Sequence, residues 1–535
     1  MRFWHIFGLE RADNDEKLLF FMTGGLLLAL AVVGIVNPQG LNSTLNGAFG
    51  WVLTYFGWWF MLLGFILLAF STFMVFSRYG NIRIGGQDAE PEFDVFSWLA
   101  MVFTVGYSGS IIIWGVGEPI SIVTNPPPQP LPVGGVSIES LALAFMFIHE
   151  VFPGLAMWYP PFALAFGLII YTRGTDSYKF SSMLKVFLDD DRYKPLYWAV
   201  DLAALVAIIG GVAAAIGFSA QVFSALVNTV FGLPPTMLTY ALFGVLGLVF
   251  LGDVWLGLRK GIRNAARITV VLMLITFALL LVVGPTLFIA NIGLDAGGVW
   301  LGNIFRLSLY TAPTAESNWA HQWTSFWWAW WAAWGLFVGS FVARVSKGRT
   351  IRETFACLVV IPGVLLWLQH SIVGGWVLAP GYIEPVSNAL SSGGIPNALA
   401  IAVTLTPLAP VLGALLMLVI AGYVVTSLDS AVYILSSITL GNEDPNARNR
   451  AWWGVLLAFL GVMTLELPVF DAMQAFPTVL ALPFTLFLLA IAYASYVAAR
   501  DYYKEEFATT EEDTLITSTK TETNSPLSQG QDDDD

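Results

Sequence analysis

Six tryptophans lie within twelve positions of one apolar stretch and could bind a cation through their ring faces. They are followed by a basic run, and the two sets are Trp323, Trp327, Trp328, Trp330, Trp331 and Trp334, then Arg344, Lys347, Arg349 and Arg352. On a helix the first and last rings are ~16 Å apart, so they cannot all lie at one membrane interface, where tryptophan usually gathers. Spacings of three and four residues place most of them on one helix face. Such a column of π surfaces suits a quaternary ammonium group, which is positively charged but has no N–H to donate. Ordinary packing between helices is the competing interpretation.

A second polar pattern interrupts an apolar stretch at residues 101–119, which read MVFTVGYSGSIIIWGVGEP. Small residues at this density weaken a helix, and an unwound stretch of a transporter exposes backbone groups to substrate and ions. Close helix packing through small residues is the alternative. Glu118 and Pro119 end the stretch, where the carboxylate could cap a turn or close a gate.

Hydroxyl groups lie side by side at Thr426 and Ser427, deep in another apolar stretch. Together with the carbonyl near Tyr423 they offer the hard oxygen ligands that a dehydrated sodium ion prefers, by analogy with calcium and magnesium. Alternatively, both hydroxyls bond back to carbonyls of their own helix. Asp429 is an expensive buried acid that could equally anchor a helix end.

Two ionisable residues, His149 and Glu150, lie near the middle of a further apolar stretch. Such groups in a membrane span are functional candidates. Glu150 could pair with His149, relay protons or face a cationic substrate, and the sequence does not choose among these roles.

The composition identifies the class of protein that must position these residues. Hydrophobic residues make up 57% of the chain, charged residues 11%, and the mean hydropathy is +0.72. A soluble globule of this composition would expose a large apolar surface, so we expect an all-α integral membrane protein rather than a barrel. Apolar runs long enough to span a bilayer predict twelve transmembrane helices. They lie near residues 18–37, 50–76, 95–124, 139–171, 196–225, 235–257, 267–291, 326–345, 354–379, 403–440, 451–466 and 474–499.

The distribution of basic residues supports the even number of spans. With twelve spans, 23 of the 24 Lys and Arg residues lie on one side and only Arg306 lies opposite. The positive-inside rule then places both termini in the cytoplasm of a multi-pass protein of the cell membrane. Residues 1–17 show no signal peptide and form a cytoplasmic segment, and residues 501–535 form an acidic, disordered cytoplasmic tail.

Catalytic chemistry is not indicated. The lone Cys357 forms no intrachain disulfide, the four histidines show no transition-metal cluster, and no nucleophile and base occur at matching depths. We therefore expect no enzyme activity, no organic cofactor and no nucleic-acid partner.

Residues 323–353, WTSFWWAWWAAWGLFVGSFVARVSKGRTIRE, closely resemble the signature of the betaine, choline and carnitine transporter (BCCT) family. The glycine-broken third span ending at Glu118 and Pro119 and the stretch 425–430 also match, and the likeness extends from about residue 15 to 500. The resemblance implies a LeuT-like fold of two inverted five-helix repeats, spans three to seven and eight to twelve, with two additional N-terminal helices. It also implies a homotrimer among membrane lipids, in which residues 18–500 form the transporter domain of each protomer.

The same resemblance implies a substrate site and a sodium site. Substrate would be bound by Trp330, Trp331 and Trp334, with Tyr107, Ser108, Gly109 and Ser110 opposite them. Sodium, the coupling ion, would be bound by the backbone of Thr104 and Tyr107, the carbonyl of Tyr423 and the hydroxyls of Thr426 and Ser427.

The chain also departs from the family pattern. The fourth span reads HEVFPGL from His149, where the family usually has His-Trp and His-Pro-Trp, so one aromatic wall is altered and Trp158 or Trp114 could replace it. Gly335 and Leu336 replace a common Ser-Pro, and residues 211–215 of the fifth span lack the hydroxyls of a second sodium site.

These features lead to one expected function and two competitors. We expect a sodium-coupled secondary active importer of a quaternary-ammonium compatible solute, glycine betaine first, for osmoprotection. Serine at position 110, where choline-accepting relatives tend to offer an acid, favours a zwitterion. A proton-coupled or exchange transporter of choline or carnitine that uses Glu150 is the nearest alternative, and an osmotically gated channel is the alternative from another class.

Overall fold

The computed structural model describes residues 2–107, 109–175, 177–234, 241, 244–250, 252, 261–464 and 469–508. Its regular elements in these ranges are helices, apart from one isolated bridge between Arg83 and Thr350. The all-α class expected from composition is therefore confirmed, whereas residues 509–535 of the expected tail lie outside the described residues.

The N-terminal part consists of α1 (Arg2–Ile6), α2 (Asn14–Val36) and α3 (Pro38–Phe76). Asp13 begins α2 with a capping box, because its carboxylate accepts from Glu16 N at 2.8 Å while the Glu16 carboxylate accepts from Asp13 N at 3.0 Å. Pro38 begins α3 at a position where the missing N–H costs no helical hydrogen bond.

The third predicted span is broken where its small residues occur. After η1 (Arg78–Asn81), α4 (Val95–Gly106) ends at Tyr107, whose backbone is extended with φ −128° and ψ 97°, and α5 (Gly109–Thr124) begins two residues later. The expected interruption is present, and Ser108 at its centre lies outside the described residues.

The fourth and fifth spans follow. The fourth contains α6 (Ile138–Glu150), α7 (Gly154–Ala165) and η2 (Phe166–Thr172). Short α8 (Ser181–Leu184) and η3 (Asp191–Tyr193) precede the long α9 (Lys194–Thr229). Most of the predicted span 235–257 lies outside the described residues.

The seventh predicted span, 267–291, has the wrong boundaries. α11 (Gly261–Val283) ends before Pro285, and a separate α12 (Thr286–Gly302) begins there, followed by α13 (Ile304–Ser308). Because proline cannot donate a helical hydrogen bond, an apolar run through Pro285 does not remain one helix.

The C-terminal half begins with η4 (His321–Ser325) and α14 (Phe326–Val345), then α15 (Ile351–Phe355), η5 (Ala356–Val360) and α16 (Ile361–Val377). It continues with α17 (Ile383–Thr404), α18 (Ala409–Leu440), α19 (Ala447–Thr464), α20 (Val469–Thr485), α21 (Leu488–Tyr503) and η6 (Lys504–Ala508). The predicted span 403–440 corresponds to α18, which begins later than expected, at Ala409, directly after Leu408 with its positive φ of 63°.

Eight described helices are long and apolar enough to cross a membrane, or nine if α20 and α21, bent by 53°, form one span. The third span does not count among these because its halves are separate short helices. The predicted number of twelve remains a prediction.

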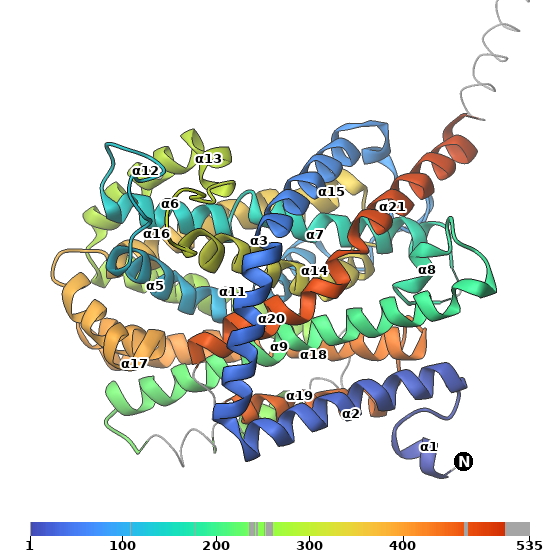
Figure 1. Cartoon of the computed structure of the whole chain (residues 1–535), viewed down its shortest axis with the longest axis horizontal. Helices are drawn as coiled ribbons and strands as arrows, with labels where there is room; N and C mark the ends of the chain where they lie inside the picture. Colours follow the sequence, from blue (N-terminus) through green and yellow to red (C-terminus); the bar gives the residue numbers. More distant parts are fainter. Residues whose placement is uncertain are drawn as a thin grey trace, which may run out of the picture.

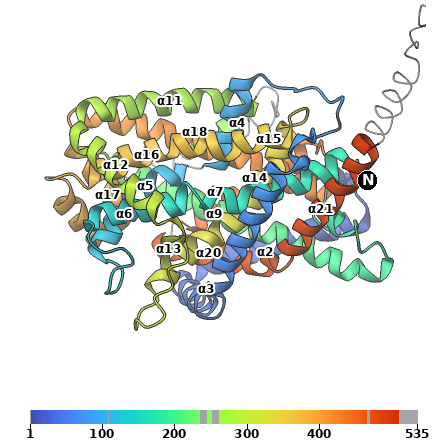
Figure 2. The same cartoon turned by 90° about the horizontal axis from the view of Figure 1, so that it is seen from above.

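Helix α14 lies in the interior of the bundle, and every residue from Phe326 to Val345 is buried. Figures 1 and 2 show it among α7, α9 and α20, with α2, α3 and α11 toward the periphery. Gly335 and Gly339 allow this contact, because a Cβ at either position would collide with Phe162 of α7. The replacement of Ser-Pro by Gly335 and Leu336 thus permits close approach of two helices.

Candidate functional site

Four indole rings form a group in the interior, which we call the tryptophan column: Trp327, Trp330 and Trp331, which are stacked, and Trp114, which meets them edge-on. The Trp327 ring is nearly parallel to that of Trp330, with centroids 5.3 Å apart, and to that of Trp331 at 5.8 Å. Trp114 reaches the column from α5, 5.5 Å from Trp327 and 6.0 Å from Trp330. Because all four side chains are at least 95% buried, their faces point into the protein and not toward lipid.

Tyr159 of α7 provides an aromatic wall that sequence reasoning missed. Its ring is perpendicular to Trp331, at an interplanar angle of 89° and a centroid distance of 5.3 Å, and 6.1 Å from the Tyr107 ring. The Tyr159 hydroxyl donates to the carbonyl of Gly106, the last residue of α4. Its position directly after Trp158 in the altered fourth span was the only sequence signal for this role.

The other predicted aromatic residues lie elsewhere. Trp158 packs against α3, where an added Cβ at Gly64 would lie 3.4 Å from its ring. Trp334 of α14 packs against α9, where an added Cβ at Gly211 would be 3.1 Å from the indole. The centroid of its ring lies 5.0 Å from that of Phe337. The structure therefore groups Trp330 and Trp331 with Trp114 and separates Trp334 from their stack.

The small residues predicted opposite the tryptophans are described only in part. Gly109 and Ser110 begin α5, but the Ser110 side chain, like the whole of Ser108, lies outside the described residues. Tyr107 is buried, and its hydroxyl donates to the Leu358 carbonyl at 3.2 Å.

Two of the predicted sodium ligands, Thr104 of α4 and Ser427 of α18, are in contact. The Ser427 hydroxyl donates to the Thr104 carbonyl at 3.4 Å, which links the two helices. The Thr426 hydroxyl lies 2.9 Å from the Gly422 carbonyl and 3.1 Å from the Tyr423 carbonyl. The alternative of bonding within the helix therefore describes Thr426 but not Ser427. The cluster consists of buried neutral oxygens, a donor set that fits a monovalent hard cation.

Two buried pairs hold the ionisable residues of the interior. His149 Nδ1 lies 2.6 Å from Glu118 Oε1, and His149 Nε2 lies 3.0 Å from the Thr324 hydroxyl. Glu150 does not pair with its neighbour His149, because its Oε2 lies 3.2 Å from Nε2 of His370 on α16. Consecutive helical residues project about 100° apart, which sends these two side chains to different helices.

The first pair is connected to the tryptophan column. The indole N–H of Trp331 donates to the His149 carbonyl at 2.7 Å. The His149 ring stacks on Trp327 at 6.2 Å with an interplanar angle of 20°. The Glu118 and Glu150 pairs were not predicted, because each joins residues of separate spans.

A cavity of about 610 Å³, which we call the vestibule, approaches the column from the end of the molecule that carries the 125–137 loop. Neutral amides, hydroxyls and aromatic rings make up much of its lining, including Asn46, Phe49, Ser121, Thr124, Asn125, Asn318, Gln322, Trp323 and Gln474. Trp323 is thus a lining residue of the vestibule rather than a member of the column.

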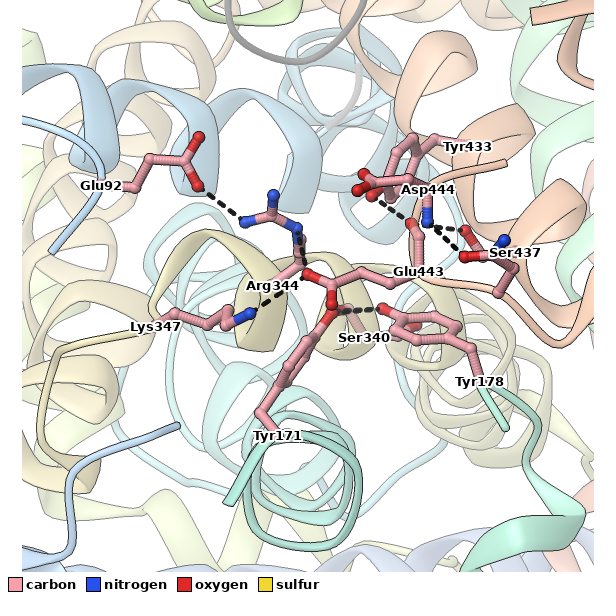
Figure 3. Close-up of polar contacts among 11 residues, drawn as sticks. Glu92, Tyr171, Tyr178, Ser340, Arg344, Lys347, Tyr433, Ser437, Glu443 and Asp444 are labelled. Atoms are coloured by element: carbon pink, nitrogen blue, oxygen red, sulfur yellow. Dashed lines mark hydrogen bonds and ion pairs between the residues drawn. The ribbon is translucent and has the colours of Figure 1, made fainter. Parts of the chain in front are cut away.

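Ion pairs of Arg344 fix the C-terminal end of α14, away from the vestibule (Figure 3). Arg344 Nη1 lies 2.9 Å from Glu92 Oε2, and Arg344 Nε lies 2.8 Å from Glu443 Oε1. Lys347 Nζ also reaches Glu443, at 3.4 Å. The Tyr178 hydroxyl donates to the Ser340 carbonyl at 3.3 Å. These contacts join the end of α14 to three loops.

Comparison with known proteins shows the family of the chain. The family model described as BCCT, betaine/carnitine/choline family transporter, matches residues 18–504. The glycine betaine transporter OpuD of Bacillus subtilis is 30% identical over 89% of this chain and 93% of its own length. A probable glycine betaine transporter of Desulfitobacterium hafniense is 30% identical over 91% of this chain and 98% of its own length. The betaine/ectoine transporter LcoP of Corynebacterium glutamicum is 30% identical over 90% of this chain and 77% of its own length.

Proposed function

Because this chain belongs to the betaine/carnitine/choline transporter family, we propose that it imports glycine betaine by sodium-coupled secondary active transport. Its family and relatives are membrane transporters and not enzymes. The physiological role in this proposal is the accumulation of a compatible solute against osmotic stress.

The observation that carries the choice of substrate is the tryptophan column beside the break between α4 and α5. A trimethylammonium group cannot donate a hydrogen bond, so it loses its water at little cost only where aromatic faces replace the lost solvation. Trp331 and the perpendicular Tyr159 offer two such faces in a buried position. The predicted roles of Trp330 and Trp331 are kept in this proposal, and Trp334 supports the site from the side of α9.

The carboxylate of a zwitterion has a natural partner at the same break. Helix α5 begins at Gly109, and the N-terminus of a half-helix in a membrane favours negative charge through its free N–H groups. Ser108, Gly109 and Ser110 would therefore face the carboxylate, while the tryptophans face the ammonium group.

Sodium coupling is proposed from the oxygen cluster of α4 and α18. Thr104, Tyr423, Thr426 and Ser427 would hold the ion, together with the backbone of Tyr107 at the end of α4. A bound cation here would hold the broken third span against α18, so that ion and substrate stabilise the same arrangement of helices. Residues 211–215 lack hydroxyl groups, so a second sodium ion is not proposed.

The proposed architecture keeps the expectations from the sequence. It has twelve transmembrane helices in a LeuT-like pair of inverted five-helix repeats, with two additional N-terminal helices, and it assembles as a homotrimer in the cell membrane. Both termini would lie in the cytoplasm, because 23 of the 24 basic residues then lie on that side.

The position of Glu150 bears on the alternative substrates. A carboxylate that selects choline would have to face the ammonium group, but Glu150 lies against His370 of α16. This pairing favours a zwitterion over a cation. Ectoine, for which one relative is named, is a cyclic zwitterion and is the natural competitor to test.

Uptake of labelled glycine betaine into proteoliposomes under an inward sodium gradient tests the proposal. We expect saturable uptake that disappears when the gradient is collapsed, with unlabelled ectoine competing better than choline. Uptake with protons but not with sodium would remove the coupling ion from the proposal. Flux that rises linearly with concentration would indicate a channel.

A further inference from the structure

Two pairs of acidic and histidine side chains lie in the interior beside the tryptophan column, and the transport mechanism above uses neither. Glu118 and His149 form the first pair, Glu150 and His370 the second, and all four side chains have no exposed surface. Ionisable groups inside a membrane are expensive to maintain, so they commonly mark paths for ions or protons.

The two pairs form one cluster between α5, α6 and α16. His149 and Glu150 are consecutive on α6 and reach Glu118 on α5 and His370 on α16. Helix α5 also contacts the second pair, because an added Cβ at Gly115, one turn before Glu118, would lie 3.5 Å from His370 Nδ1. A movement of α5 therefore changes the surroundings of all four groups.

The vestibule lies near this cluster. His149 Nε2 lies 3.0 Å from the hydroxyl of Thr324, whose neighbour Trp323 lines the vestibule. Ser121, one turn after Glu118, lines it as well. The Glu118–His149 pair therefore lies within one helical turn of residues that line the vestibule.

The net charge that each pair can carry at low cost depends on whether water reaches it. In water near neutral pH a carboxyl group is ionised and an imidazole is mostly neutral, so each hydrated pair carries one negative charge. Away from water such a net charge is costly, and one added proton makes the pair neutral. This energetic cost is larger for the second pair. Apart from the ion pair between them, neither oxygen of Glu150 and neither nitrogen of His370 makes a hydrogen bond within the described structure.

Few other ionisable groups on the neighbouring helices could balance the negative charge of the two pairs. Apart from the four members of the pairs and Glu139 at the start of α6, the ionisable groups among the described residues of the elements packed against α6 and α16 are Asp295, Arg306, Arg344, Tyr159, Cys357, Glu384, Arg263 and Arg267. Asp295 binds Ser140 in the first turn of α6, and Arg306 binds the Pro132 carbonyl in a loop.

We propose that the Glu118–His149 and Glu150–His370 pairs form a proton-binding site that takes up a proton from the vestibule when the transporter closes around its substrate. The link to substrate is the Trp331 indole, which donates to the His149 carbonyl at 2.7 Å. This inference rests on the transport function proposed above and adds to it a proton as a second linked ion.

Uptake of labelled glycine betaine into proteoliposomes with a fixed inward sodium gradient tests the site. We expect the initial rate at low substrate concentration to rise at least about threefold when the outside is made one pH unit more acidic than the inside. In the double variant Glu118→Gln/Glu150→Gln, which keeps side-chain size but cannot exchange these protons, the rate should no longer respond. The control Asp295→Asn removes an exposed carboxylate on α12 and should respond as the unchanged protein does.

A direct measurement on the unchanged protein avoids dependence on the folding of any variant. Glycine betaine added with sodium to purified protein in weakly buffered detergent should raise the pH seen by an indicator dye by the equivalent of about one to two protons per chain, at most one for each pair. Sodium-driven uptake with no response to pH and no proton binding would overturn the proton site and leave the transporter proposal intact. A double variant that transports and keeps the response would also overturn it, whereas absence of solute uptake in every condition would overturn the transport function itself.

Discussion

Replacing Trp331 by alanine should weaken the apparent affinity for glycine betaine by about 30-fold. The Trp331 ring is 97% buried, and its face is held by the hydrogen bond to the His149 carbonyl and by the perpendicular Tyr159. A desolvated cation–π contact is worth about 2 kcal/mol, and each ~1.4 kcal/mol changes an equilibrium constant tenfold. Trp331→Phe keeps a ring but loses the N–H hydrogen bond, so its affinity for glycine betaine should lie between that of the unchanged protein and that of Trp331→Ala.

The carbon isostere of the substrate separates charge from shape in this test. In 3,3-dimethylbutanoate a quaternary carbon replaces the nitrogen, so the size and the carboxylate remain while the positive charge is lost. The assay compares KM for labelled glycine betaine with inhibition by the isostere in proteoliposomes. In the unchanged protein the isostere should bind about 30-fold more weakly than glycine betaine, and in Trp331→Ala the two should bind about equally.

Trp376→Ala is the matched control for this variant. Trp376 is 99% buried on α16, and its indole N–H donates to the Thr406 hydroxyl at 3.0 Å, away from the column. Its loss should reduce the yield of folded protein without changing KM. An unchanged KM in Trp331→Ala, or an isostere that binds the unchanged protein as well as glycine betaine does, would show that the column serves packing alone.

Further predictions concern the ion site, the C-terminal end of α14 and one helix cap. Ser427→Ala removes a proposed sodium ligand and should raise the sodium concentration for half-maximal uptake about tenfold or more, whereas an unchanged sodium dependence would refute the site. Glu443→Gln removes the carboxylate that pairs with two basic side chains and should speed labelling of the buried Cys357 by thiol reagents; equal labelling rates would show that these ion pairs do not hold the end closed. Hydrogen bonds from Ser97 lower the pKa of Asp94, the N-cap of α4, so its stabilisation is present above the ordinary pKa of the carboxyl and is lost as pH falls through the lowered value. The thermal stability of Asp94→Asn should therefore depend less on pH between about 5 and 3 than that of the unchanged protein.

Local features of the chain were predictable because they depend on neighbouring residues. The dense glycines and serines from Gly106 to Ser110 predicted the break between α4 and α5, since small residues weaken a helix wherever they gather. The tryptophan spacing on α14 predicted rings at several depths for the same reason. Helix boundaries near Pro285 and Leu408 were missed, because hydropathy alone does not mark where a helix ends within a continuous apolar run.

The composition and residue spacing of this sequence determined that the protein is a helical membrane protein, where its third span breaks and that many tryptophans lie at depth, because these properties follow from the residues of a single segment. Only the tertiary structure decided that Trp114 belongs to the tryptophan column, that Trp334 packs against α9 instead, and that Tyr159 contacts Trp331. It also decided that Glu150 pairs with a residue 220 positions away, His370, rather than with its neighbour. Partners of this kind belong to helices whose contact is set by packing of the whole bundle, and the spacing of residues along one helix contains no information about which helix will lie beside it.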